Sequence, residues 1–201
     1  GWYGFNGGSA VVAGADAAFA VLASQISAAT AACVWMLQDI KQDGKSSLLG
    51  ACTGSIAGLA AVTPAAGFVG PVGALCIGAI SSVVCRFFSF TIKEKFKYDD
   101  SLDVFGVHGV GGFVGTILLG VFGSPVFGGF NAVPILTQTS IQTAAAFFTV
   151  AYTAIASYIC LKLTGAICGG IRAPPEAEAV GMDEYSHGET IYVESSPAPT
   201  A

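Results

Sequence analysis

The chain alternates between long uncharged stretches and short polar breaks. No Asp, Glu, Lys or Arg occurs from Ser46 to Cys85, or from Val104 to Leu161. Because about 20 apolar residues cross a bilayer, each stretch is long enough for two spans joined by a turn. A soluble helical core would instead need charges every few residues on its outer faces. The pattern therefore predicts an all-α polytopic membrane protein.

Breaks rich in Gly, Pro and charged residues divide the chain into one truncated and five complete transmembrane helices. Residues 1–15 are uncharged and too few to cross a bilayer. The chain also begins at Gly1, inside an apolar run and without an initiator Met, so we expect a fragment cut within a helix. Complete spans are expected at residues 17–38, 48–62, 72–92, 103–122 and 138–163, and a Gly/Pro-rich turn at 63–71.

The basic residues predict how these helices are oriented. All eight Lys and Arg lie at the ends of the first, third and fifth complete spans or in the segments that follow them. The loops at residues 8–16, 63–71 and 123–137 contain neither Lys nor Arg. The positive-inside rule places the basic side, and with it the C-terminus, in the cytoplasm of a cell whose plasma membrane holds the protein.

Composition agrees with a membrane protein that ends in a polar tail. The chain is 53% hydrophobic and 10% charged, whereas soluble domains carry roughly 25% charged residues. Six of the thirteen acids lie beyond Arg172, where Pro, Glu, Ser and Gly dominate. We expect a transmembrane region at 1–170 and a solvated tail with little fixed structure at 171–201. No basic patch of the kind that binds nucleic acid is present.

Cysteine and histidine lack the spacing of a metal or redox site. The six cysteines stand singly in apolar segments without CxxC spacing, and are interpreted as small packing residues. The two histidines, His108 and His187, lie in different regions of the chain and no cysteine cluster joins them. No metal and no other cofactor is therefore expected.

Small residues recur at the spacing that lets membrane helices approach closely. Gly111 and Gly115 have GxxxG spacing, and Gly54 and Gly58 repeat it. In lipid, where hydrophobicity does not drive helices together, such residues allow backbone contact. Tight packing of these helices is expected.

His108 is the most informative candidate for chemistry. It lies about one and a half turns inside an apolar span, in the sequence DVFGVHGVGGFVG. An ionisable group at membrane depth is costly and usually faces the bundle interior or a pathway. Desolvation favours the neutral imidazole, which can donate and accept a hydrogen bond. The alternative is a histidine that is hydrogen-bonded to a neighbouring helix.

Two further groups of residues admit both a functional and a structural interpretation. Asp103 opens the span that contains His108, and is either an N-cap or a functional acid. Trp2, Tyr3 and Phe5, with Ser9 nearby, could hold a cation on their aromatic faces. The residues alone favour the other interpretation, an aromatic belt of the kind found at membrane interfaces.

Four long segments resemble the ammonium transporter family (Amt/MEP/Rh), and the Amt/MEP branch more than Rh. They are GWYGFNGGSA at 1–10, SLLGACTGSIAGLAAVTPAAGFVGPVGA at 47–74, DDSLDVFGVHGVGGFVGTILLGVFG at 99–123 and IRAPPEAEAVGMDEYSHGETIY at 171–192. The resemblance implies a fold of eleven spans with an inverted repeat, assembled as a homotrimer with one pore per chain. This chain would start within the sixth span and end after the eleventh.

The resemblance also implies roles for single residues. His108 is similar to the second of two pore histidines, and Phe5 to one member of a phenylalanine gate. Ser9 matches the hydroxyl of an outer ammonium-recruiting site. The remaining matches are Trp2 and Val104 as pore-lining residues and Asp103 as a structural acid. The partner histidine, the partner gate phenylalanine and the recruiting aromatics would belong to the first five spans.

The implied function is ammonium transport rather than enzymatic catalysis. Ammonium would be captured at the outer mouth and deprotonated, and ammonia would cross past the histidines. One rival is a neutral gas channel of the Rh type. Another is an ammonium sensor that signals through the cytoplasmic tail, where a kinase or a regulatory protein could act on Tyr185, Ser186, Thr190 or Tyr192.

Overall fold

The computed structural model describes residues 1–190, and this part of the chain is helical without any β-strand. Wide π-helical turns form η1 and η2, and η3 is a 3-10 turn. In chain order the elements are α1 Trp2–Gly8, α2 Ala15–Asp43, α3 Leu48–Val62, α4 Pro71–Phe87, η1 Phe88–Ile92, α5 Lys93–Phe96, η2 Val104–Gly109, α6 Val110–Phe122, η3 Pro125–Phe127, α7 Ile135–Cys168, α8 Pro175–Val180 and α9 Met182–His187.

The chain forms two compact units, Gly1–Val150 and Ala151–Ala201, with the division inside α7. The sequence predicts the boundary between the transmembrane region and the tail after residue 170. That boundary concerns membrane location, which the division into compact units does not address, so it stays a prediction.

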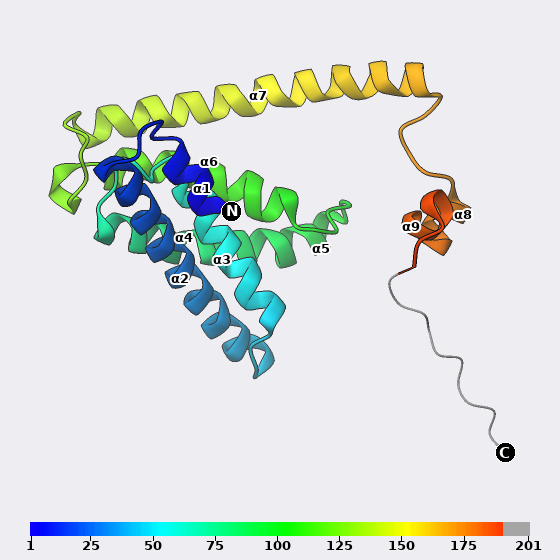
Figure 1. Cartoon of the computed structure of the whole chain (residues 1–201), viewed down its shortest axis with the longest axis horizontal. Coiled ribbons are helices and arrows are strands. Elements are labelled where there is room, and N and C mark those ends of the chain that lie inside the picture. The colour runs from blue at the N-terminus through cyan, green and yellow to red at the C-terminus, as the bar shows by residue number, and fades with distance from the viewer. Residues whose placement is uncertain (191–201) are drawn as a thin grey trace. The chain divides into compact units, whose positions relative to one another are not determined.

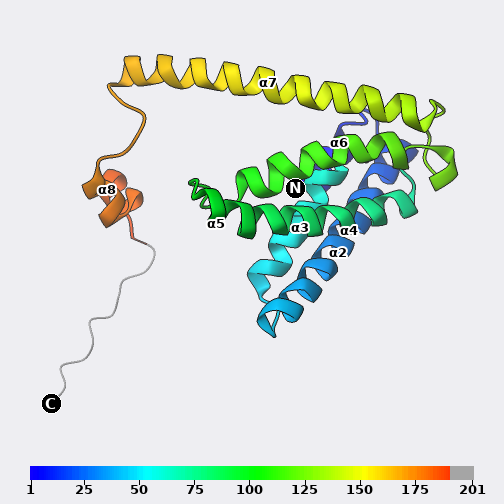
Figure 2. The same cartoon turned by 180° about the vertical axis from the view of Figure 1, so that it is seen from behind.

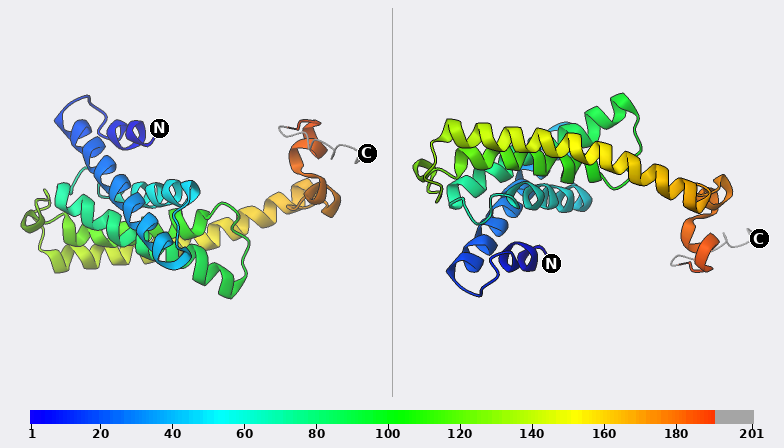
Figure 3. Two further views of the ribbon diagram at one scale, coloured as in Figure 1. Left: turned by 90° about the horizontal axis from the view of Figure 1, so that it is seen from below. Right: turned by 90° about the horizontal axis from the view of Figure 1, so that it is seen from above.

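The first unit is a bundle of crossing helices. In Figure 1, α2 and α3 run side by side in one diagonal direction, and α4 and α6 cross them. The view from behind in Figure 2 and the two views in Figure 3 also show that α2 and α4 cross, and these two helices are in contact. The short helix α1 packs against α2.

Local sequence signals explain where several helices begin and end. The Ser47 side chain caps α3 by accepting a hydrogen bond from the Gly50 amide. Pro71 occupies the first turn of α4, where its missing amide hydrogen costs nothing. Gly44, with a φ of +76°, ends α2 in the left-handed conformation that favours glycine. The predicted turn at 63–71 is confirmed.

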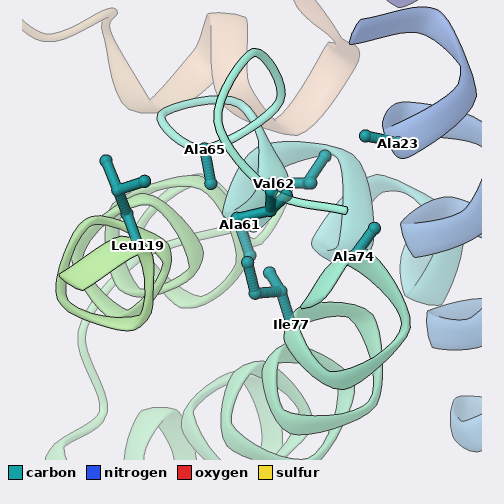
Figure 4. Packing of buried hydrophobic residues seen from close by; sticks show 8 residues of the cluster. Ala23, Ala61, Val62, Ala65, Ala74, Ile77 and Leu119 are labelled. Atoms are coloured by element: carbon teal, nitrogen blue, oxygen red, sulfur yellow. The ribbon is translucent and has the colours of Figure 1, made fainter. Parts of the chain in front are cut away.

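Small side chains build the core of the bundle. Its largest cluster joins α2, α3, α4 and α6, as Figure 4 shows, and consists of Ala23, Ala61, Val62, Ala65, Val69, Ala74, Ile77 and Leu119. A Cβ added at Gly115 would lie 1.8 Å from the Ala61 carbonyl oxygen, and one at Gly58 would lie 2.4 Å from the Ser27 carbonyl oxygen. The backbones therefore touch at these glycines, which confirms the close packing predicted from GxxxG spacing.

Four stretches of helix are long and apolar enough to cross a membrane: Ala15–Asp43, Pro71–Phe96, Val104–Phe122 and Ile135–Cys168. They correspond to four of the five predicted complete spans. The fifth, α3, is apolar but has only 15 residues. The predicted all-α, polytopic membrane fold is confirmed. The α2 helix continues to Asp43, past its predicted end at residue 38, because Gly44 rather than the first charge stops it.

In the second unit, the expectation of a tail with little fixed structure is wrong for residues 175–187. Two short helices, α8 and α9, follow the end of α7. Arg172 donates through Nε to the Glu178 carboxylate at 2.8 Å, and Ala177 is buried. A proline in the first turn of α8 and acids in the first turns of both helices favour helix formation. Tyr192 lies outside the described residues.

Candidate functional site

An aromatic stack brings together residues that are far apart in the sequence. The indole of Trp2 on α1 and the imidazole of His108 on η2 are nearly parallel, with ring centroids 5.8 Å apart and an interplanar angle of 13°. The Phe5 ring meets Trp2 edge-on, with centroids 6.5 Å apart. Three of the predicted site residues therefore lie in one cluster.

The indole of Trp2 is also held at its nitrogen. Trp2 Nε1 donates to the Thr63 hydroxyl at 2.8 Å. That hydroxyl in turn donates to the Leu59 carbonyl at 2.7 Å, within the last turn of α3. A neutral bridge of two hydrogen bonds thus joins α1 to α3 beside the stack.

One face of α1 carries the predicted site residues, and Asn6 at the edge of that face anchors the helix to α2. Trp2, Phe5 and Ser9 have the i, i+3, i+7 spacing that places side chains on the same face. Asn6 is buried, and its amide donates to the Ser24 hydroxyl of α2 at 2.8 Å. The Phe5 ring is 62% exposed, so this face of α1 is open.

Ser9 lies at the end of this row of side chains. Its hydroxyl donates to the Phe5 carbonyl at 2.8 Å, which leaves the oxygen lone pairs free to accept hydrogen bonds. A depression of about 330 Å³ adjoins it, with Asn6, Asp16, Thr63 and Phe68 among the lining residues. A small cation or polar molecule could rest here against oxygen atoms and an aromatic side chain.

His108 lies on a π-helical segment, a form often found at functional sites. Val104, four residues earlier, is 56% exposed, and His108 is exposed as well. The buried residues of the segment, Gly106 and Val107, are held by contacts with neighbouring helices. Gly106 packs against Ser89, and the Cys85 thiol approaches the Val107 carbonyl at 3.7 Å. The predicted pore residues of η2 are thus presented on a supported backbone.

The N-cap interpretation of Asp103 is wrong. Asp103 has a left-handed backbone, φ +53°, and its side chain makes no capping hydrogen bond. Instead, Asp103 accepts from Lys93 Nζ at 2.9 Å, and the Asp100 carboxylate accepts from the amides of residues 104–106. The left-handed turn brings Asp100 back over the helix start and points Asp103 away from it. Burial and the Asp100 carboxylate together raise the pKa of Tyr98 in the same loop.

Sequence reasoning missed Thr63 and Asp100. It also missed an ion pair between α4 and α2, in which Arg86 Nε lies 3.0 Å from the Asp39 carboxylate. Thr63 stands in a turn motif, where nothing in the spacing indicates a partner on α1. Asp100 and Asp103 both precede the span, and only the backbone path decides between them. Within residues 1–190, no group of three His, Cys, Asp or Glu side chains is arranged to hold a metal ion.

These features define a polytopic helical membrane protein with an aromatic–imidazole cluster on one open face. The profile of the Ammonium Transporter Family matches residues 1–192 of the chain. The ammonium transporter of Aquifex aeolicus is 42% identical over 194 residues, which cover 96% of this chain and 45% of that protein. Ammonium transporter Amt1 of Archaeoglobus fulgidus is 40% identical over 197 residues, 96% of this chain and 49% of that protein.

Solved structures give the same result. Mep2 of Saccharomyces cerevisiae matches with a TM-score of 0.76 at 32% identity, over 88% of this chain and 42% of that chain. A protein described as a sensor Amt protein matches with a TM-score of 0.75 at 26% identity, over 92% and 46%. The chain belongs to the ammonium transporter family. It spans about half the length of the curated relatives it matches.

Proposed function

We propose that this chain supplies one wall of an ammonium-conducting pore, with His108 lining the route. The observation that carries the proposal is the stack of Trp2 on His108 on an open face of the first unit. An imidazole at membrane depth is costly, and a position beside a pathway accounts for it. The names of the curated relatives support ammonium as the substrate.

The order of side chains along α1 supports a route on which ammonium enters at Ser9 and moves toward His108. From the loop that follows α1 inward, the row runs Ser9, Phe5 and then Trp2 beside His108. Ser9 offers lone pairs to the N–H groups of ammonium, and aromatic faces add an attraction of roughly 0.5–2 kcal/mol for a cation. Phe5 then narrows the path as a gate, and Val104 forms part of the wall beyond it.

Deprotonation at the gate is favoured by the cost of moving charge into an apolar passage. An ammonium ion loses its hydration there, at a cost of several kcal/mol even after relaxation. Ammonia carries no net charge, and the nitrogens of a neutral imidazole can donate to it or accept from it. Potassium, which cannot lose a proton, meets the full barrier, so selectivity arises from chemistry rather than from pore diameter.

The rest of the passage belongs to a second wall. His108, Phe5 and Val104 are exposed within this chain, and its curated relatives are about twice as long. We assign the cover of this face to the part of a whole transporter that the chain does not match. A homotrimer in the plasma membrane, with the tail in the cytoplasm, is part of the same proposal.

A sensor is the second candidate, favoured by the match to a sensor Amt protein. The helices α8 and α9 give residues 175–187 a defined shape that a partner could recognise. Tyr185, Ser186 and Thr190 lie on or beside α9 and are candidate phosphorylation sites. Truncation after Arg172 separates the two functions, because a sensor loses its nitrogen response and keeps ammonium uptake.

The direct test is a chimera in which this chain replaces the matching part of the Aquifex aeolicus relative. Expressed in cells that lack ammonium transporters, it should restore growth on low ammonium. His108→Ala should lower ammonium uptake about tenfold or more, the equivalent of ~1.4 kcal/mol in the rate-limiting step. Uptake is measured as the initial rate at matched protein levels.

His187→Ala is the matched control, because that histidine lies on α9 and the proposal gives it no part in the route. Its chimera should transport at the unmodified rate. Unchanged uptake and unchanged potassium exclusion in the His108→Ala chimera would refute the proposed role. Ammonia permeation without any ammonium current would favour the neutral gas channel instead.

A further inference from the structure

The plane of the His108 ring depends on a single neighbour. Within residues 1–190, its ring contact is the stack with Trp2, and neither imidazole nitrogen takes part in a hydrogen bond or ion pair. Flanking Gly109 adds no side chain beside the ring, and the Phe105 ring lies next to it. The imidazole orientation therefore follows the orientation of the indole.

The indole, in turn, depends on Thr63. Trp2 lies on a helix of only seven residues and is half-buried, so backbone packing alone holds it weakly. Its one polar atom donates to the Thr63 hydroxyl at 2.8 Å. That contact fixes rotation of the indole about its side-chain bonds, which an edge-on contact with Phe5 does not do.

The donor and acceptor of each hydrogen bond in this bridge follow from the groups involved. An indole nitrogen can only donate, so Thr63 must accept from Trp2. The Thr63 proton is directed to the Leu59 carbonyl at 2.7 Å, within the same helix. This leaves a lone pair of the hydroxyl oxygen aimed at Trp2, and it anchors the acceptor to the backbone of α3.

We infer that Thr63 is a positioning residue for His108, acting through Trp2. The hydroxyl oxygen holds the indole, and the indole face sets the plane in which the imidazole nitrogens meet the transported molecule. This inference rests on the proposed pore. It concerns the hydroxyl oxygen that accepts from Trp2, and is separate from the part of Thr63 that lines the depression beside Ser9.

The chain offers a clean spectroscopic test, because it contains two Trp and two His residues. With ¹⁵N-labelled Trp and His in detergent micelles, two indole and two imidazole systems are observed by NMR. Thr63→Val should shift the Trp2 indole N–H resonance and speed its solvent exchange. The ring-current shift of the His108 protons should fall, so that they move toward those of His187.

Two substitutions give the comparison its controls. Thr63→Ser keeps the hydroxyl and should restore both signals. Thr116→Val removes a hydroxyl that donates to the Gly112 carbonyl on α6 in the same way, but has no indole partner, and should change neither. An unchanged Trp35 indole resonance reports that each variant is folded. If Thr63→Val leaves the His108 resonances in place, the inference is wrong.

Transport by the Aquifex chimera separates this inference from the proposed function. Thr63→Val should lower ammonium uptake about fivefold, as for the loss of one hydrogen bond, and Thr63→Ser should recover it. A chimera that never transports ammonium contradicts the pore proposal, whatever the spectra show. A transporting chimera in which Thr63→Val has full activity contradicts only the positioning role.

Discussion

At the scale of single residues, the bundle contains a charged pair almost out of contact with solvent. Arg86 on α4 donates through Nε to Asp39 on α2 at 3.0 Å, and the two side chains are 7% and 8% exposed. The other two guanidinium nitrogens of Arg86 donate to the Gln42 side-chain oxygen and to the Asp43 carboxylate. Each guanidinium edge is satisfied, which is the condition under which a buried charge is tolerated.

Asp39→Asn should therefore be strongly destabilising. The change leaves the Arg86 charge buried without its closest carboxylate, and breaking a buried pair costs roughly 3–5 kcal/mol. The measurement is the thermal unfolding midpoint of the full chain in detergent, followed by circular dichroism.

The control for that prediction is Asp43→Asn. The Asp43 side chain is 65% exposed and 3.5 Å from Arg86, so its contribution should be ~0–1 kcal/mol. Equal shifts of the unfolding midpoint in both variants would show that burial does not govern the strength of this pair.

Residue contacts were the part of the site least accessible from the sequence. The hydropathy pattern placed His108 inside a span and the family motifs singled out Trp2, but nothing in the spacing predicted that the two rings stack. Asp103 and Asp100 precede the same helix, and a left-handed backbone at Asp103 transfers the capping role to Asp100. Contacts between distant segments and single backbone angles leave no periodic signal in a sequence.

At the scale of helices, the sequence was more informative, because span length and small-residue spacing follow from the bilayer itself. Glycines at Gly54, Gly58, Gly111 and Gly115 all lie where a side chain would meet another helix. The limits of the helices were less accessible. The α2 helix runs past its first charge, since charged side chains at a membrane surface are compatible with continued helical hydrogen bonding.

Gly115→Ala should separate α6 from α3. The added Cβ would lie 1.8 Å from the Ala61 carbonyl oxygen, which is backbone and cannot rotate away. Overpacking of this kind costs typically 1–3 kcal/mol. The thermal unfolding midpoint of the chain in detergent should fall accordingly.

Gly112→Ala on the same helix is the counterpart, because a Cβ there meets nothing within 4 Å. Alanine also has the higher helix propensity, so stability should stay unchanged or rise slightly. A loss of stability of similar size in both variants would mean that helix–helix contact at Gly115 is not the cause.

At the scale of the whole molecule, the helices of the first unit begin and end at two opposite ends of the bundle. At one end, Arg86 meets Asp39, and a cavity of about 390 Å³ is lined by Lys45, Phe90 and Asp103 among others. At the other, a depression is lined by Ser9, Thr63 and Phe68, and the Phe130 amide donates to the Phe68 carbonyl. The loops predicted to lie on the basic and non-basic sides are thus gathered at opposite ends.

This arrangement of the loops requires α3 to cross from one end of the bundle to the other, although the helix is short. Fifteen residues extend about 22 Å, short of the roughly 30 Å hydrocarbon core. The Gly44–Ser47 connection lies at one end of α3, however, and Thr63 at the other, beside α1. Locally thinned lipid or its packed neighbours would have to accommodate the difference.

Reporter fusions in the Aquifex chimera test this crossing and the orientation together. A fluorescent protein joined after Ser46 or Tyr98 should mature in the bacterial cytoplasm, because these loops adjoin the basic residues. Alkaline phosphatase joined after Gly67 or Asn131 should be active, since it folds only outside the cytoplasm. A fluorescent fusion after Gly67 would show that α3 does not cross. Inverted signals at all four sites would show that the predicted cytoplasmic and outer sides are exchanged. They would still show that α3 crosses the membrane, because the loops before and after it would lie on opposite sides.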